Sequence, residues 1–187
     1  MALWWIIGLA VAAVLGYVVW TYNRLVTLNK RADGAWSDID VQLKRRWDLV
    51  PALVATVKGY AAHESGTLEG VVEARNRASA ASSGPIAGRG DSERGLAAAV
   101  GGIFALAEAY PELKASGNFL DLQKSLIQIE DQVQYARRYY NAVVRDLNTL
   151  IESVPSLFVA APARFRPRDY FQLESEAERA APRVNLS

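Results

Sequence analysis

The sequence predicts an all-α protein in which a single N-terminal transmembrane helix is followed by an antiparallel bundle of about four helices. Three observations predict this fold: an uncharged apolar stretch at the start, apolar residues that recur with a helical period, and no alternating run typical of a strand. The 187 residues suffice for one ordinary domain. We expect an anchor over 1–23, a bundle over 24–155 and a tail over 156–187.

The anchor is predicted from length and from the residues at its ends. The first 23 residues carry no side-chain charge, and Leu3 to Tyr22 provides the roughly 20 apolar residues that cross a bilayer core. Trp4 and Trp5 lie at one end and Trp20 and Tyr22 at the other, where aromatic rings prefer the headgroup regions. A cleaved signal peptide is the alternative, but it would begin with basic residues and end in a small-residue cleavage site.

The flanking charges predict how the span is oriented. No basic residue precedes it, whereas Arg24, Lys30 and Arg31 follow it closely. Basic residues are retained on the cytoplasmic side, so we expect a single-pass protein of the cell (inner) membrane with its N-terminus outside and its soluble domain in the cytoplasm. The net charge of +1 gives no field that would attract nucleic acid, which is therefore not an expected partner.

The first bundle helix follows the anchor directly. From Leu25 to Ala61 the apolar residues recur every 3 or 4 positions, with the mean of about 3.6 of a straight α-helix. Pro51 predicts a kink or a break near residues 47 to 51. A second helix is expected over 67–81, and a loop over 82–95.

The end of that loop has two features of interest. Asp91 is a plausible N-cap for the third helix, with Glu93 in its first turn. Arg89-Gly90-Asp91 matches the tripeptide that integrins bind, but a match of only three residues is explained by chance.

The last helix is the most regular. Pro111 and Gly117 end the helix before it, and Asn118 with Asp121 resembles a capping box. From Phe119 to Val154 apolar steps of 3 and 4 alternate, and Pro155 ends the run. This is the period of a bundle seam. In this register Ala136 and Tyr140 face the core, Arg137 and Tyr139 flank it, and the outward residues are Arg138, Asn141, Arg145 and Asn148.

The residue types favour no chemistry. The chain has no cysteine and one histidine, which excludes thiol nucleophiles and the common zinc and iron–sulfur ligand sets. His63 and its neighbour Glu64 diverge on a helix, so they do not form an acid–base pair. Exposed i, i+4 and i, i+3 ion pairs, Asp40 with Lys44 and Arg45 with Asp48, account for the charges of the first helix. We expect no enzyme, no catalytic residue, no metal and no cofactor.

Three ordered blocks resemble the LemA family of bacterial membrane proteins. They are "YNRLVTLNKRADGAWSDIDVQLKRRWDLVPALVATVKGYAAHESGTLEGVVEAR", "AEAYPELKASGNFLDLQKSL" and "IEDQVQYARRYYNAVVRDLN". The resemblance implies a single transmembrane helix and a bundle of about four helices, and it attaches no enzymatic activity. The family's positions correspond here to Arg45, Arg46, Asp48, Pro51, Tyr60, Tyr110, Arg137, Arg138, Tyr139, Tyr140 and Asn141. This chain departs from the family pattern at Ala52, where many members have asparagine, and at Trp47, where some have histidine.

These observations favour a membrane-anchored scaffold that associates with itself or with other membrane proteins, with lipid contacting the one span. The candidate interaction surface is Arg45, Arg46, Asp48, Arg137, Arg138, Tyr139, Asn141 and Arg145. The residues expected to be structural are Trp36, Pro51, Tyr60, Tyr110, Pro111 and Tyr140. The alternative function is a ligand-binding sensor with a polar site between helices, formed by Arg45, Asp48, Arg137 and Tyr140. The tail should pack an aromatic patch on the bundle through Phe165, Tyr170, Phe171 and Leu173.

Overall fold

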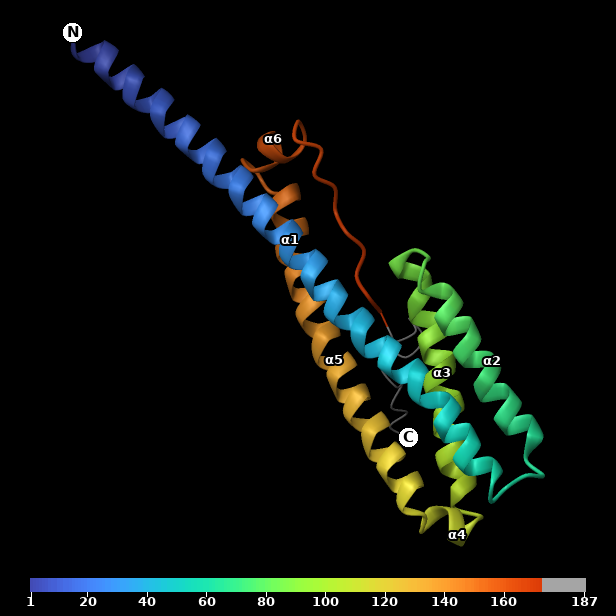
Figure 1. Cartoon of the computed structure of the whole chain (residues 1–187). Coiled ribbons are helices and arrows are strands. Elements are labelled where there is room, and N and C mark those ends of the chain that lie inside the picture. Colours follow the sequence, from blue (N-terminus) through green and yellow to red (C-terminus); the bar gives the residue numbers. More distant parts are fainter. Residues whose placement is uncertain (173–187) are drawn as a thin grey trace, which may run out of the picture. The chain divides into compact units, whose positions relative to one another are not determined.

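The computed structural model describes residues 1–172, and every regular element within them is helical (Figure 1). The all-α prediction is therefore confirmed. The helices are α1 (Ala2–Lys58), α2 (Ser65–Ala81), α3 (Ile86–Ala107), α4 (Pro111–Lys114), α5 (Gly117–Glu152) and α6 (Leu157–Ala160). They fall into two compact units, one formed by Met1–Asp38 with Arg138–Tyr170 and the other by Ile39–Arg137 with Phe171 and Gln172.

Helix α1 is a single helix of 57 residues with Pro51 inside it, so of the kink or break expected there the break is wrong. A proline removes the backbone donor that would bind the carbonyl four residues earlier, which here belongs to Trp47. Arg75 of α2 replaces that donor, because its Nε lies 3.4 Å from the Trp47 carbonyl oxygen. A neighbouring helix thus satisfies the group that Pro51 leaves unpaired.

In the first unit the side chains of residues 1–20 are exposed, and packing begins at Thr21. Leu25 and Leu28 of α1 then join Leu147 and Ile151 of α5 and Ala160 of α6 in one core cluster. The polypeptide leaving α5 therefore returns to the part of α1 that directly follows the apolar stretch (Figure 1).

The second unit is built on the predicted apolar face of α1. Ile39, Leu43, Trp47, Val50 and Val57 are all buried there, as the 3.6-residue spacing requires. Helices α2 and α3 pack against each other. An edge-to-face contact at 6.1 Å between Phe104 and Phe119 joins α3 to α5. The rest of this core is Leu53, Ala61, Leu68, Val71, Ala74, Ala78, Leu96, Val100, Ile103, Ala107, Leu113, Leu126, Val133, Ala136 and Phe171.

Several helix ends differ from the prediction. Helix α3 begins at Ile86, directly after Pro85, so Asp91 is not its N-cap but pairs with Arg94 on the surface. Of the expected loop over 82–95, residues 82–85 do connect α2 to α3, but residues 86–95 are helical because Arg89, Gly90 and Glu93 occupy a buried face. Asn118 lies inside the first turn of α5, which begins at Gly117, and so does not precede that helix as a cap. Burial of one face here outweighs the local preferences of glycine and aspartate.

The seam of α5 is confirmed over most of its length. Phe119, Leu126, Val133, Ala136, Tyr140, Val143 and Leu147 are buried. Its last expected member, Val154, lies beyond the helix end at Glu152 and is exposed. In the tail Phe165 packs on the cluster of the first unit and Phe171 is buried in the second, whereas Leu173 lies outside the described residues.

Candidate functional site

A cluster of buried charges lies inside the second unit. The exposed fractions are 4% for Arg46 of α1 and 1% for Glu93 of α3. Arg46 Nη1 lies 3.5 Å from Glu93 Oε2, and the indole nitrogen of Trp47 donates to Glu93 Oε1 at 2.9 Å. The same guanidinium also forms an ion pair with Glu130 of α5. Every charge in the cluster therefore has a partner, which a buried ion requires.

A second buried arginine extends this cluster along α3. Arg89 lies one turn before Glu93 and forms an ion pair with Asp40, which replaces the Asp40–Lys44 pair expected from the sequence. Residues four apart share a helix face, so α3 presents both side chains to α1. Two ion pairs, Arg46 with Glu93 and Asp40 with Arg89, thus connect α1 to α3.

Burial dominates the ionisation of the central pair. It raises the pKa of Glu93, and the charge of Arg46 and the hydrogen bond from Trp47 act in the opposite direction. Burial likewise lowers the pKa of Arg46, against the attraction of Glu93. Within residues 1–172 no group of three or more His, Asp or Glu side chains is placed to hold a metal ion. The charge pairs of Arg46 with Glu93 and Glu130 can hold helices together, and the same groups can bind a polar ligand group.

A cavity of about 200 Å³ adjoins the cluster. Arg46 and Glu130 form its polar wall. The remaining lining residues are Ala97, Val100, Gly101 and Phe104 of α3 and Leu126 and Ile127 of α5. An apolar cavity with a few polar groups at one side is the usual form of a small-ligand site.

The tripeptide Arg89-Gly90-Asp91 has a structural role in α3. Arg89 is buried in its ion pair, and Asp91 pairs with Arg94. Gly90 lies against the backbone of the C-terminal segment, where a Cβ would overlap the carbonyl oxygen of Gln172. The glycine is therefore required by a close backbone approach.

Replacing Gly90 with alanine is expected to lower the free energy of unfolding by about 1–3 kcal/mol, because the new methyl group must displace the backbone at Gln172. Gly95→Ala is the matched control in the same helix, since nothing lies within 4 Å of its added Cβ. It should stabilise the protein by up to about 1 kcal/mol. Urea unfolding followed by circular dichroism measures both, and equal effects would contradict the close approach.

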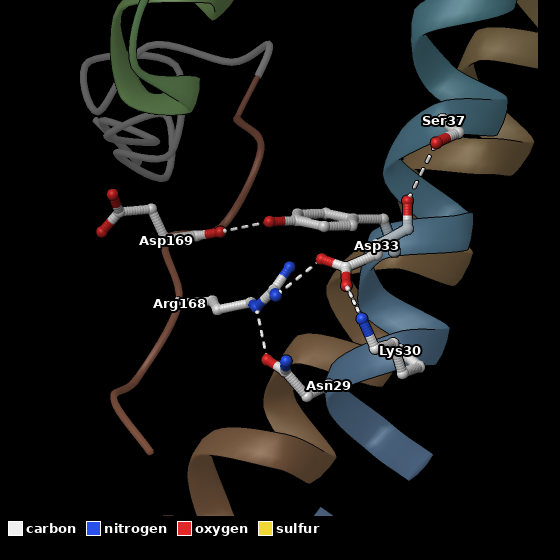
Figure 2. A network of polar contacts seen from close by, with 7 residues as sticks. Asn29, Lys30, Asp33, Ser37, Arg168 and Asp169 are labelled. Atoms are coloured by element: carbon white, nitrogen blue, oxygen red, sulfur yellow. Dashed lines mark hydrogen bonds and ion pairs between the residues drawn. The ribbon is translucent and has the colours of Figure 1, made fainter. Parts of the chain in front are cut away.

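A second polar network fastens the C-terminal segment within the first unit (Figure 2). Arg168 donates to Asn29 Oδ1 at 3.1 Å and to Asp33 Oδ1 at 2.7 Å. The side chain of Asn148 binds the backbone of Arg168 on both sides, accepting from its amide at 2.8 Å and donating to its carbonyl at 2.9 Å. The Tyr140 hydroxyl donates to the Asp169 carbonyl oxygen at 3.0 Å. The prediction that Asn148 faces outward is therefore wrong.

We expect Arg168→Ala to lower the free energy of unfolding by about 1 kcal/mol, because two bonds to half-exposed partners are lost. Arg138→Ala makes the same change at an exposed position and should alter stability by less than about 0.5 kcal/mol. Thermal melts of the two variants make the comparison. A larger loss for Arg138→Ala than for Arg168→Ala would contradict this assignment.

Tyr140 links this network to the core, where its ring meets Trp36 at 5.4 Å. Burial raises the pKa of Tyr140 above its ordinary value of 10.0. The unfolded chain then loses this proton at lower pH than the folded protein, so the stabilisation is complete below the ordinary pKa and decreases as pH rises through the folded value. Above about pH 10 the urea midpoint of the native protein should fall with rising pH, and that of Tyr140→Phe should fall less steeply. Parallel pH profiles would contradict this assignment.

The predicted interaction residues are only partly on the surface. Arg45, Asp48, Arg138, Tyr139 and Arg145 are exposed, while Arg137 and Asn141 are half-buried. The prediction that Arg46 belongs to the interaction surface is wrong, because this residue lies on the core face of α1 and is buried. Tyr140, proposed for the sensor site with Arg45 and Asp48, is buried and bound to Asp169, whereas those two are exposed.

The residues expected to be structural occupy helix ends and contacts. Tyr110 donates to Glu64 Oε1 at 3.0 Å, which raises the pKa of Tyr110. Pro111 is at the start of α4, and Tyr60 lies half-exposed in the turn after α1. Leu3, Trp20 and Tyr22 are exposed along the N-terminal apolar stretch of α1. His63 is exposed in the same turn region as Tyr60.

Comparison of the sequence with known proteins identifies the family of this chain. The family model described as "LemA family" matches residues 35–186. The chain belongs to the LemA family. Two relatives, Magnetosome protein MamQ 1 and MamQ 2 of Paramagnetospirillum magneticum, are 26% identical over 188 residues, covering 88% of this chain and 69% of theirs. Magnetosome protein MamQ of Magnetospirillum gryphiswaldense is 25% identical over 187 residues, covering 87% and 69%.

LemA family membership and the start of α1 together support a membrane location. By length and composition α1 is the one described helix that could cross a membrane, and none of the apolar part is buried inside the protein. An exposed apolar surface of this length is otherwise unfavourable in water.

Proposed function

We propose that this LemA-family protein is a non-enzymatic membrane scaffold whose helical domain associates with further copies of itself at the cytoplasmic face. The observation that carries the proposal is the continuity of α1, which runs from the exposed apolar segment into the buried core without a linker. A continuous helix couples the position of the anchor to that of the domain it carries. Such coupling suits assembly in the plane of a membrane.

The surface proposed for association is on α5 in the first unit. Arg138, Tyr139 and Arg145 are exposed there, and Arg138 and Arg145 are two helical turns apart on one face. Arginine and tyrosine are the residue types enriched in the energetic centres of protein interfaces. A second copy of the chain is the partner we propose for this surface.

Cysteine cross-linking tests this association in native membranes. The chain has no cysteine of its own, so Arg145→Cys supplies a single reactive site on the proposed surface. We expect cross-linked dimers from Arg145→Cys and few from Glu112→Cys, a control at an exposed position of α4. Equal yields from the two positions, or only monomers from both, would overturn the proposal.

The cytoplasmic orientation is tested with the same single-cysteine proteins. Basic residues after the span support it, since Arg24, Lys30 and Arg31 follow within ten residues. Membrane-impermeant maleimide added to intact cells should leave Glu112→Cys unlabelled and should label it after lysis. Labelling before lysis would place the domain outside.

A ligand-binding sensor is the second candidate, and the cavity beside Arg46 and Glu130 favours it. A Cβ at Gly101 meets no atom within 4 Å, so Gly101→Leu extends into the open space beside the cavity, whereas Gly102→Leu is a control that does not line it. A ligand at about 100 times its dissociation constant adds roughly 2.7 kcal/mol of stability. A small-carboxylate and amine panel should raise the melting temperature of the native protein and of Gly102→Leu but not of Gly101→Leu. No shift in any of them would reject the sensor.

A further inference from the structure

An exposed apolar cluster lies where α5 ends and α6 begins. The exposed fractions are 72% for Val154, 38% for Leu157 and 71% for Phe158. We call residues 153–161 the α5–α6 corner. Ala160 of the same corner is buried in the core of the first unit, so the corner has one face fixed to the protein and one face without a partner among the described residues.

This corner is held at the depth where α1 leaves its candidate span. Ala160 packs with Leu25 and Leu28, and just beyond the corner the ring of Phe165 meets Tyr22 at 6.0 Å. Leu25 is only three residues beyond Tyr22, or about 4.5 Å along a helix. Figure 1 shows α6 beside this part of α1. The contacts therefore place the corner beside the end of the candidate span.

The chemistry of the corner fits a lipid surface. Aromatic and aliphatic side chains that bury in the interface, next to basic residues that meet anionic headgroups, are the features of interfacial membrane attachment. Arg24, Arg164 and Arg166 are exposed around the corner, and Glu152 is its nearest acidic neighbour in sequence. The surplus of positive charge favours anionic lipid.

We propose that the α5–α6 corner inserts Val154, Leu157 and Phe158 into the interface of the leaflet from which α1 emerges. The protein would then contact the bilayer at two places: the span and the corner. Because both belong to the first unit, the second contact fixes how this unit is rotated about the axis of α1. The inference rests on the membrane anchor and not on self-association.

Single cysteines carrying an environment-sensitive fluorophore test this in the full-length protein. The labelled variants are Phe158→Cys, Val154→Cys, which leaves Phe158 in place, and Leu120→Cys, a control at a half-exposed apolar position of α5 in the second unit. Val14→Cys marks the span. Each is reconstituted in nanodiscs of zwitterionic and anionic phospholipid and titrated with spin-labelled lipid and with aqueous iodide.

We expect spin-labelled lipid to quench the fluorophores at residues 158, 154 and 14, and iodide to quench the one at residue 120. Iodide quenching at residues 158 and 154 equal to that at residue 120 would overturn the inference. If neither spin-labelled lipid nor iodide quenched the fluorophores at residues 158 and 154, the inference would also be overturned, because another protein surface would then cover the corner. Failure of lipid to quench residue 14 would refute the anchor, and with it the scaffold; the other two failures leave the scaffold intact.

Discussion

Replacing Glu93 with methionine should lower the free energy of unfolding by about 3–5 kcal/mol, because it leaves the buried guanidinium of Arg46 without its inner partner. The indole nitrogen of Trp47 loses its acceptor in the same variant. Methionine approximates the shape of the glutamate side chain, so the loss comes from the broken charge pair and not from a cavity. Arg46 then keeps only Glu130, which is partly exposed to water. Urea unfolding of the full-length protein in mild detergent, followed by circular dichroism, measures it.

The double variant Arg46→Met with Glu93→Gln separates charge pairing from packing. Glutamine retains an oxygen for the indole of Trp47, and the partner left behind, Glu130, is partly exposed to water. Replacing a buried ion pair with residues of similar shape is often close to neutral, so we expect stability within about 1.5 kcal/mol of the native protein. If the double variant were as unstable as Glu93→Met, the charge pair would not be the source of the effect.

Val143→Asp is expected to cost on the order of 3–5 kcal/mol, because it buries a carboxylate without a partner in the core of the first unit. The neighbouring Val144 and Leu147 are fully buried, so the new side chain has apolar surroundings on this face of α5. Arg145→Asp places the same residue at an exposed position two residues later and should change stability by less than about 0.5 kcal/mol. Similar melting curves for the two variants would mean that α5 is rotated from this assignment.

The sequence was sufficient to predict the helices because their signal is local. Periodic apolar residues located the core faces of α1 and α5, and most of the residues assigned to them are buried, while the others, Val154 excepted, are half-buried. Helix starts were less predictable: α3 begins after Pro85 because Arg89 and Glu93 find partners on another helix. Nothing near Asp91 in the sequence carries that information.

The polar networks could not be predicted because their partners are distant in sequence. Asn29 and Arg168 are separated by 139 residues, and Arg46 and Glu93 by 47. One signal was present: Arg46 follows Leu43 by three residues and precedes Val50 by four, which places it on the buried face of α1. Its neighbour Arg45 has the same chemistry but lies on the exposed face.

The proposal that this protein is an assembling scaffold is tested most directly by the mass of the full-length protein in native nanodiscs, measured by light scattering. We expect a defined oligomer that dissociates when Arg138 and Arg145, two exposed arginines of α5, are both replaced by glutamate. A strictly monomeric mass, unchanged in that variant, would contradict self-association.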